Sequence, residues 1–199
     1  MHTAAWLRER FAQPRPYTPA TTGDGLAPEG VPLRAASVLM PVVDRGGALS
    51  VIFTRRTAHL HDHAGQISFP GGRAEPEDPS AEHTALREAE EEIGLAPAHV
   101  HVLGRIDEYV TGTGYRITPI VGLIQTPLEL KADDFEVAEI FEVPLPFLLD
   151  PGNHQRSKVN FNGRRRHYYA MPYHDYYIWG ATAGMLMNLY RFVSAGVGR

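Results

Sequence analysis

The sequence predicts an α+β fold in which a mixed β-sheet is sandwiched between α-helices. Apolar, β-branched runs recur along the chain between turn residues, as expected for strands. Two amphipathic segments, near residues 79–93 and 178–193, have the spacing of helices. This order of elements, with one helix in the middle and one at the end, favours a mixed sheet with helices on its faces.

Length and composition fit a single domain with an N-terminal extension. The chain has 199 residues, and 43% of them are hydrophobic, which is enough for a substantial core. Residues 13–33 are rich in Pro, Gly and Thr and lack periodicity, so they predict an extended segment. We therefore expect an N-terminal arm over 1–33 and one domain over 34–199 that includes the C-terminal helix.

Charge and composition exclude several classes of protein. The net charge is −4 and the pI is about 6.2, so no global positive field would attract nucleic acid, although a nucleotide-sized substrate is compatible. Disulfides, thiolate zinc sites and cysteine nucleophiles are excluded because the chain has no cysteine. No apolar run approaches the roughly 20 residues of a membrane helix, and the N-terminus lacks the apolar core of a signal peptide. We expect a cytoplasmic protein without membrane contact.

The first part of the domain predicts a β-hairpin and a short strand. The runs 36–43 and 49–55 are apolar, and the turn residues 44–47 separate them. A short strand at 66–69 then leads into the turn Pro70-Gly71-Gly72. Later strands are expected at 100–107, 116–124 and 136–143, and a hairpin at 159–161 and 166–171 about Asn162-Gly163.

A helix is predicted from residue 79 or 80 to Ile93. Asp78 or Ser80 can cap its start, Pro79 suits the first turn, and Gly94 suits a left-handed stop. Its apolar side is formed by Ala85, Leu86, Ala89 and Ile93.

The same helix carries a row of glutamates. Glu88, Glu91 and Glu92 stand at i, i+3 and i+4, so their side chains converge on one side. Such carboxylates repel one another and persist together if a cation lies among them or the face is fully solvated. We expect this face to lie opposite the apolar side and to point into a cleft. Glu90 lies on another side, where we expect it to be solvated.

The stretch from Gly72 resembles the Nudix box, Gly-x5-Glu-x7-Arg-Glu-U-x-Glu-Glu-x-Gly-U, in which U is a bulky apolar residue. The second half matches in register as Arg87-Glu88-Ala89-Glu90-Glu91-Glu92-Ile93-Gly94-Leu95. The first half departs, because Gly72 is one residue too far from Arg87 and Pro79 occupies the expected Glu position. Asp78 is the nearest acid, and we expect it to support Arg87. The resemblance implies the Nudix fold, a mixed sheet between helices.

Coenzyme A pyrophosphatases, a subset of the Nudix family, carry the same longer stretch. They also have an upstream signature, roughly Leu-Leu-Thr-x-Arg-(Ser/Ala)-x3-Arg-x3-Gly-Gln-(Ile/Val)-x-Phe-Pro-Gly-Gly, which residues 52–72 resemble. The matching positions are Thr54, Arg56, Gly65, Gln66, Phe69, Pro70, Gly71 and Gly72. Thr57 departs from the Ser/Ala position, and His61 replaces the second Arg, which would be a stronger anion partner than neutral His.

The resemblance implies a site for Mg²⁺ or Mn²⁺ on the acidic helix. Glu88 and Glu92 are the expected ligands, and Glu91 is a third ligand or the group that orients a water. Arg87 is counted with them among the catalytic residues. The upstream signature implies substrate contacts from Arg56, Gln66, His61, Gly71 and Gly72.

The reaction implied is hydrolysis of the diphosphate of coenzyme A or its thioesters, to 3′,5′-ADP and 4′-phosphopantetheine or its acylated form. The metal would take up non-bridging oxygens of this small-molecule substrate and help to activate a water for in-line attack. We expect one further acid from outside the box, Glu108, Glu136 or Glu139, as a ligand or a base.

Two other functions stay open. The chain could be a Nudix pyrophosphatase for other nucleoside diphosphate derivatives or for nucleotide-capped RNA. It could also be a non-catalytic module that binds a nucleotide, although such a module should have lost carboxylates and all three remain.

Two short polar clusters have alternative interpretations. The run His59-Leu60-His61-Asp62-His63 is close to the zinc element of metallo-β-lactamase-like hydrolases, but its spacing is one residue short, and we favour a polar loop. Arg164-Arg165-Arg166 is expected to be solvated, with contact to an anionic substrate or to the second protomer of a homodimer as the alternative.

Overall fold

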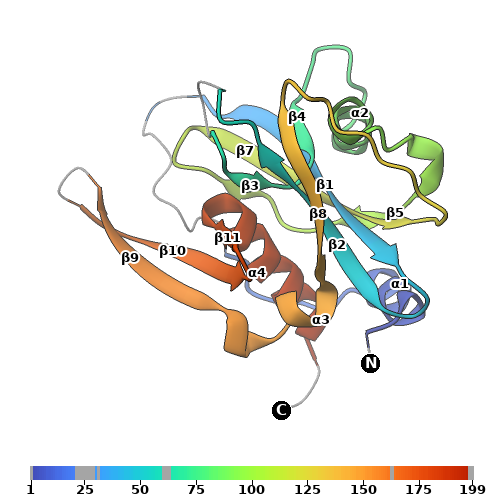
Figure 1. Ribbon diagram of the computed structural model, residues 1–199. Coiled ribbons are helices and arrows are strands. Elements are labelled where there is room, and N and C mark those ends of the chain that lie inside the picture. The colour runs from blue at the N-terminus through green and yellow to red at the C-terminus, as the bar shows by residue number, and fades with distance from the viewer. Residues whose placement is uncertain (1, 21–29, 31, 60–63, 162–163, 197–199) are drawn as a thin grey trace.

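The computed structural model describes residues 2–20, 30, 32–59, 64–161 and 164–196 (Figure 1). Its helices are α1 (Ala4–Ala12), α2 (Ala81–Ile93), α3 (Leu145–Leu148) and α4 (Gly180–Ser194), with 3₁₀ turns η1 (Pro97–His99) and η2 (Pro151–Asn153). Its strands are β1 (Arg34–Asp44), β2 (Leu49–Arg56), β3 (Ile67–Ser68), β4 (Gly71–Arg73), β5 (Val100–Arg105), β6 (Tyr109–Val110), β7 (Tyr115–Ile124), β8 (Val137–Pro144), β9 (Gln155–Phe161), β10 (Arg164–Tyr173) and β11 (Tyr176–Trp179).

The larger sheet is mixed, as the sequence predicts. Its strands follow the order β3-β2-β1-β7-β5, while β4 pairs with β1, β6 with β7 and β8 with β2. The central strand β1 runs parallel to β7 and antiparallel to β2 and β4. The pairing of β2 with β8 sets Arg56 opposite Val137, so segments about 80 residues apart in the chain meet at one end of the sheet.

The last hairpin forms a sheet of its own, which the sequence did not indicate. β9, β10 and β11 form an antiparallel three-stranded sheet that projects beside the main one (Figure 1). Met171 of β10 and Ile178 of β11 are fully buried in the main core. The predicted turn at Asn162-Gly163 lies outside the described residues.

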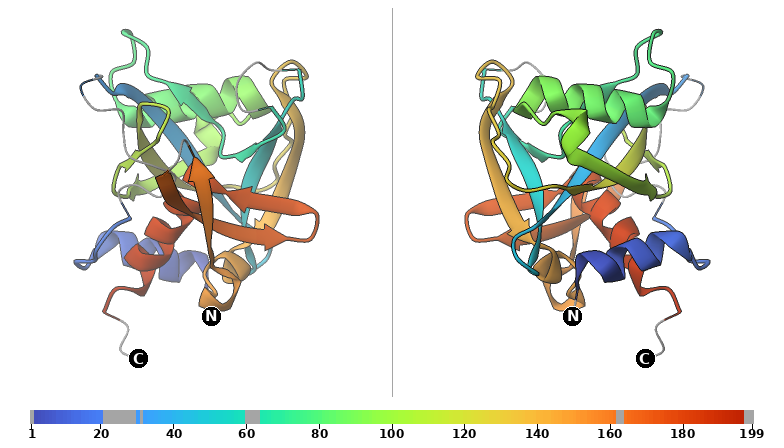
Figure 2. Two further views of the ribbon diagram at one scale, coloured as in Figure 1. Left: turned by 90° about the vertical axis from the view of Figure 1, so that its left-hand side faces the viewer. Right: turned by 90° about the vertical axis from the view of Figure 1, so that its right-hand side faces the viewer.

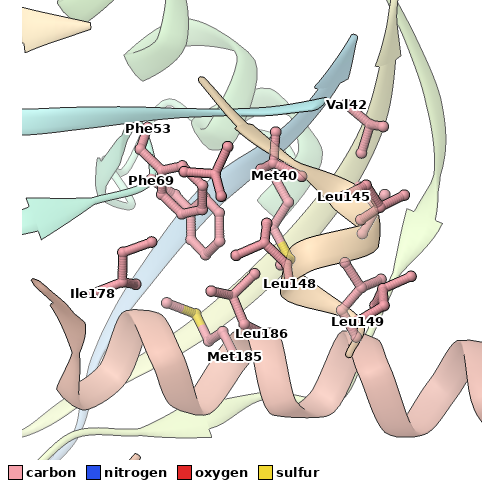
Figure 3. Packing of buried hydrophobic residues seen from close by; sticks show 14 of the residues in the cluster. Met40, Val42, Phe53, Phe69, Leu145, Leu148, Leu149, Ile178, Met185 and Leu186 are labelled. Atoms are coloured by element: carbon pink, nitrogen blue, oxygen red, sulfur yellow. The ribbon is translucent and has the colours of Figure 1, made fainter. Parts of the chain in front are cut away.

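Helices cover both faces of the larger sheet (Figures 1 and 2). On one face α2 buries Ala85, Ala89 and Ile93 against Leu39 and Ile120 of the sheet. On the other face α3 and α4 enclose the larger core, shown in Figure 3; its labelled members are Met40, Val42, Phe53, Phe69, Leu145, Leu148, Leu149, Ile178, Met185 and Leu186. Each such buried side chain stabilises the fold by about 1.5–3 kcal/mol, so α2 is held on a rigid platform.

The N-terminal segment packs against the C-terminal helix. Leu7 of α1 is fully buried in the larger core, and Arg10 Nη2 donates to the carbonyl of Ala195 at 2.6 Å. Further along, the amide of Asn188 accepts from Ala20 N at 2.7 Å and donates to Ala20 O at 3.0 Å. The division into an arm over 1–33 and a domain over 34–199 stays a prediction. Within the described ranges, no helix is long and apolar enough to cross a membrane.

Candidate active site

The acidic helix ends at Ile93 as predicted but begins at Ala81, so Pro79 lies before the cap and not in the first turn. Ser80 is the N-cap, and its hydroxyl accepts from the backbone N–H of His83 at 3.2 Å. Gly94 is the C-cap with φ +67°, a conformation that glycine adopts without strain. With both ends capped, α2 presents its glutamates in a fixed register over β4. The predicted turn at Pro70-Gly71-Gly72 is wrong in part, because Gly71 and Gly72 belong to this strand and pair with Val38 and Ser37 of β1.

One expectation about this helix is wrong. The acidic face does not lie opposite the apolar side, because Glu92 is 6% exposed and lies with the buried residues. Glu92 follows Ala89 by three positions and Ala85 by seven, and at about 100° per residue these separations bring all three to one side. Glu92 is therefore a buried carboxylate on the core side of α2.

Glu92 contacts two groups from the upstream segment. Its Oε2 accepts from the backbone N–H of Gly71 at 3.3 Å, and its Oε1 lies 3.7 Å from Arg56 Nη1. Burial raises the pKa of Glu92 to about 8, although Arg56 and the Gly71 N–H oppose the shift. A carboxylate in such surroundings is stabilised as an anion when a further cation approaches it.

Glu88 lies directly over the two glycines of β4. A Cβ atom at Gly72 would overlap the Glu88 carboxylate, so only glycine leaves room for it. A Cβ at Gly71 would overlap Ser37 O, and Gly71 also has a φ of +156°. Burial raises the pKa of Glu88, while Arg87, whose Nη1 lies 3.0 Å from Oε1, opposes the shift. The predicted residues Gly71 and Gly72 thus shape the floor beneath the carboxylates.

Arg87 is held at the edge of the glutamates by Asp78. Its Nε and Nη2 donate to the two Asp78 oxygens at 3.2 and 3.1 Å, and its Nη1 donates to Glu91 Oε2 at 3.2 Å. The predicted contact of Asp78 with Arg87 is confirmed. The Glu91 side chain is 61% exposed, at the outer margin of the cleft, and Glu90 is exposed, as expected.

Arg56 joins the helix to the end of β8. Its Nη2 lies 3.8 Å from Glu136 Oε2, opposite the contact with Glu92. Its Nε is buried and has no hydrogen-bond partner in the described part of the chain. The Arg56 backbone pairs with the upstream loop, since Arg56 N donates to Gln66 O at 2.9 Å and Gly65 N donates to Arg56 O at 3.2 Å. Gln66 therefore lies beside Arg56 along the chain that leads to β4.

Glu136 is the candidate acid outside the box that reaches this cluster. Its charge acts on both Glu88 and Glu92, raising their pKa values further. Glu139 instead lies 3.3 Å from Arg55 and accepts from Tyr176 OH at 2.7 Å. Glu108 lies 3.7 Å from Arg116 on an exposed part of the surface. The arrangement brings together Arg56, Glu88, Glu92 and Glu136 and leaves Glu108 and Glu139 elsewhere.

Some predicted residues lie outside the described ranges. His61 falls there, with Asp62 and His63 of the alternative zinc element, and only the backbone of Arg164–Arg166 is described. One residue that the sequence analysis did not single out is Phe135, beside Glu136, which is 66% exposed. The signal that could have identified it is an aromatic residue within the acidic run Asp133-Asp134-Phe135-Glu136.

The donor set fits a hard divalent cation. Carboxylate oxygens are the ligands that Mg²⁺ and Mn²⁺ prefer, and Mg²⁺ takes one or two protein carboxylates and keeps several waters. In the described ranges no group of three or more acidic or imidazole side chains is arranged to hold a metal ion, and Arg56 and Arg87 lie among the glutamates. Glu92 is buried and Glu88 is partly buried beside it, so at most these two carboxylates and the exposed Glu91 are available to a partly open site of this kind.

Comparisons with known proteins agree with this geometry. A family model described as NUDIX domain matches residues 33–159. Proteins from Yersinia pestis and Yersinia pseudotuberculosis, both described as "Uncharacterized Nudix hydrolase NudL", are 40% identical over 161 residues, which cover 81% of this chain and 80% of theirs. The crystal structure of a Nudix hydrolase from M. smegmatis, RenU, is 25% identical with a TM-score of 0.50, over 62% of this chain and 81% of that one.

Proposed function

The chain belongs to the Nudix hydrolase family, and from that premise we propose that it hydrolyses the diphosphate of coenzyme A or its thioesters. The observation that carries this proposal is the position of Arg56 between Glu92 and Glu136, at 3.7 and 3.8 Å. Arg56 belongs to the segment that resembles the coenzyme A pyrophosphatase signature. A phosphate-binding arginine beside the carboxylate helix is what a diphosphate substrate requires.

Hydrogen bonds join the described parts of the signature segment to one another, which supports the proposal. Its arginine pairs through the backbone with Gly65 and Gln66, and Thr54 Oγ1 lies 3.0 Å from Ser68 Oγ across β2 and β3. Phe69 is buried, and two residues later the backbone N–H of Gly71 donates a hydrogen bond to Glu92. The resemblance therefore includes Arg56 and Gly71, which contact Glu92, and Phe69, which packs in the larger core.

Nudix hydrolases generally use divalent metal ions such as Mg²⁺ or Mn²⁺. In this chain we expect Glu88 and Glu92 to hold the ion, with Glu91 at the outer margin as a third ligand or through a bound water. When bound, it supplies positive charge for the diphosphate oxygens and acidifies a coordinated water.

The other side chains act on the substrate and on the attacking water. Among the described residues, the buried Nε of Arg56 has no hydrogen-bond partner, and its two ion-pair contacts are longer than a hydrogen bond. Its donors can therefore turn to a phosphate oxygen. Glu136 is placed to accept a proton from the attacking water or to orient it. Arg87 is a positioning residue: Asp78 fixes it, and it in turn fixes Glu88 and Glu91.

We further propose that the enzyme acts on this small molecule in the cytoplasm. The absence of cysteine, which is compatible with a reducing compartment, supports that location.

Product analysis tests the proposed cleavage. Coenzyme A and acetyl-coenzyme A, incubated with the protein and Mg²⁺ or Mn²⁺, should each yield 3′,5′-ADP, with 4′-phosphopantetheine and its acetylated form as the second products. Release of free acetate or of inorganic phosphate would mean that a thioester or a phosphomonoester is cleaved instead. Chromatography with mass detection separates these outcomes.

A further inference from the structure

Phe135 is an unusually exposed aromatic residue beside the proposed catalytic cleft. Its side chain is 66% exposed, while the other exposed large hydrophobic residues of the described chain, Tyr177 and Trp179, are 44% and 39% exposed. The Phe135 ring packs against the imidazole of His59, with ring centroids 5.0 Å apart at 57°. An aromatic face left open to solvent next to a second ring is a typical surface for stacking a planar ligand.

The backbone of Phe135 is fixed from both sides of the cleft. Thr57 Oγ1 donates to Phe135 O at 2.8 Å, which ties the turn to the end of β2. Phe135 N donates to Asp133 Oδ1 at 2.8 Å. Asp133 N donates to the carbonyl of Glu92 at 2.9 Å, which ties the same turn to α2. The ring is therefore presented on a rigid support, and its exposure is a built feature of the site.

The same contacts tie the backbone of Phe135 to segments that carry Glu136 and Arg56. Phe135 precedes Glu136, so their Cα atoms are about 3.8 Å apart, and Thr57 follows Arg56. Glu136 Oε2 in turn lies 3.8 Å from Arg56 Nη2, so a phosphate bound at Arg56 would lie near the segment that carries Phe135. In a nucleotide the base is separated from its 5′-phosphate by one ribose, so the base of a nucleotide held at Arg56 would have to bind near this segment.

We propose that Phe135, with His59 at its edge, is the stacking surface for the adenine ring of the substrate. This stacking role would make Phe135 a specificity-determining residue that favours substrates with a purine on the nucleotide half. This inference rests on the proposed function to the extent that coenzyme A carries an adenine, but it applies to any adenine-bearing diphosphate. Stacking tolerates either face of the base and needs no hydrogen bond to it.

The exposed rings of β11 are a weaker choice for this role. Tyr177 OH lies 3.3 Å from Tyr168 OH, and the ring of Trp179 packs against that of Tyr168 at 5.5 Å. These side chains contact one another on the three-stranded sheet, and no described contact joins them to Arg56 or to the glutamates of α2. Tyr177 is therefore a matched control, an exposed aromatic residue away from the proposed site.

Binding measurements with and without a base test the inference. The dissociation constants of 3′,5′-ADP and of inorganic pyrophosphate are measured with Mg²⁺ for the wild type and for the Phe135→Ala, Phe135→Trp and Tyr177→Ala variants. Phe135→Ala should raise the dissociation constant of 3′,5′-ADP by about 5- to 150-fold, the range found when an aromatic residue under a base is removed. Pyrophosphate has no base, so its dissociation constant should be the same for Phe135→Ala and for the wild type. Phe135→Trp should restore 3′,5′-ADP binding, and its added fluorescence should be quenched by 3′,5′-ADP and not by pyrophosphate. Tyr177→Ala should match the wild type.

Several results would overturn the inference. In the first two, Phe135→Ala binds 3′,5′-ADP as tightly as the wild type, or loses affinity for 3′,5′-ADP and pyrophosphate equally. In the others, the affinity for 3′,5′-ADP falls in Tyr177→Ala instead, or the wild type shows no measurable binding of 3′,5′-ADP. The assay involves no turnover, so it is separate from the proposed function. If coenzyme A is not hydrolysed while Phe135→Ala selectively loses 3′,5′-ADP, the proposed reaction is wrong and the stacking site stands. If coenzyme A is hydrolysed while Phe135→Ala binds 3′,5′-ADP as tightly as the wild type, the proposed reaction stands and the stacking site is wrong.

Discussion

Arg56 Nη1 lies 3.7 Å from Glu92 Oε1, and this contact joins two motifs that are 36 positions apart in the chain. Glu92 is 6% exposed, and burial raises its pKa, so the arginine balances only part of the cost of a buried carboxylate. Under the proposed function, this arrangement would stabilise an additional cation at Glu92 and a phosphate oxygen at Arg56. The strongest predictions follow from this pair and its neighbours.

Glu92→Gln should separate function from stability. The amide keeps the acceptor for Gly71 N–H but loses the charge, so we expect kcat to fall by about 100-fold or more and affinity for Mn²⁺ to weaken. The free energy of unfolding should stay the same or rise, because a buried charge is removed. Enzyme assays, metal titration and urea unfolding measure the three effects. Glu90→Gln, on the exposed side of the helix, is the control, and its kcat should stay within about twofold of the wild-type value. Full activity of Glu92→Gln would refute the site.

Glu136→Gln and Glu139→Gln should identify the acid outside the box. We expect Glu136→Gln to lower kcat by about 100-fold, the usual effect of losing a group that handles a proton. Glu139→Gln should weaken its contacts with Arg55 and Tyr176 and lower the free energy of unfolding by about 1 kcal/mol, with kcat little changed. Steady-state kinetics and thermal unfolding of both variants check this assignment. An inactive Glu139→Gln beside an active Glu136→Gln would reverse it.

Asp78→Asn should lose stability in a pH-dependent way. The Arg87 guanidinium holds the pKa of Asp78 far below its ordinary value of 3.8. Because the folded pKa is the lower one, the charged Asp78 stabilises the fold above the ordinary pKa, and this contribution is lost as the pH falls through the folded pKa. The difference in free energy of unfolding between wild type and Asp78→Asn should thus be full near about pH 6 and shrink below about pH 4. Urea unfolding across this range measures it. Glu77→Gln, which is exposed, should show no such trend.

Gly72→Ala should inactivate the enzyme while the fold persists. The added Cβ would overlap the Glu88 carboxylate and force it to move, and a shift of about 1 Å at a reacting centre can cost about 100-fold in rate. We expect kcat to fall on that scale, with circular dichroism unchanged. Gly152→Ala, whose Cβ would lie 3.2 Å from Asp150 Oδ1 on η2, is a control remote from α2. Equal activity in the two variants would contradict the role of Gly72.

Local features of the site were predictable from sequence, and long-range ones were not. Ser80 and Gly94 mark the ends of α2 because capping depends on neighbouring residues. The support of Arg87 by Asp78, nine residues earlier, was also within reach of the motif's spacing.

The position of Glu136 depended on the pairing of β2 with β8. Strand register over such a separation is set by tertiary packing, so three acids remained equivalent on sequence alone. The burial of Glu92 was missed because the helix was divided into an acidic and an apolar side, while Glu92 lies on the border between them. Its partners, Arg56 and Gly71 N–H, come from elsewhere in the chain.

The most direct test of the account is a ranking of kcat/KM over a panel of diphosphate substrates. The purified protein is assayed with Mg²⁺ and with Mn²⁺ on coenzyme A, acetyl-coenzyme A, ADP-ribose, NADH and nucleoside triphosphates. The account predicts that coenzyme A and its thioester rank first, with 3′,5′-ADP as a product, and that Glu92→Gln abolishes this activity. A higher kcat/KM for ADP-ribose, NADH or a nucleoside triphosphate than for coenzyme A would contradict it.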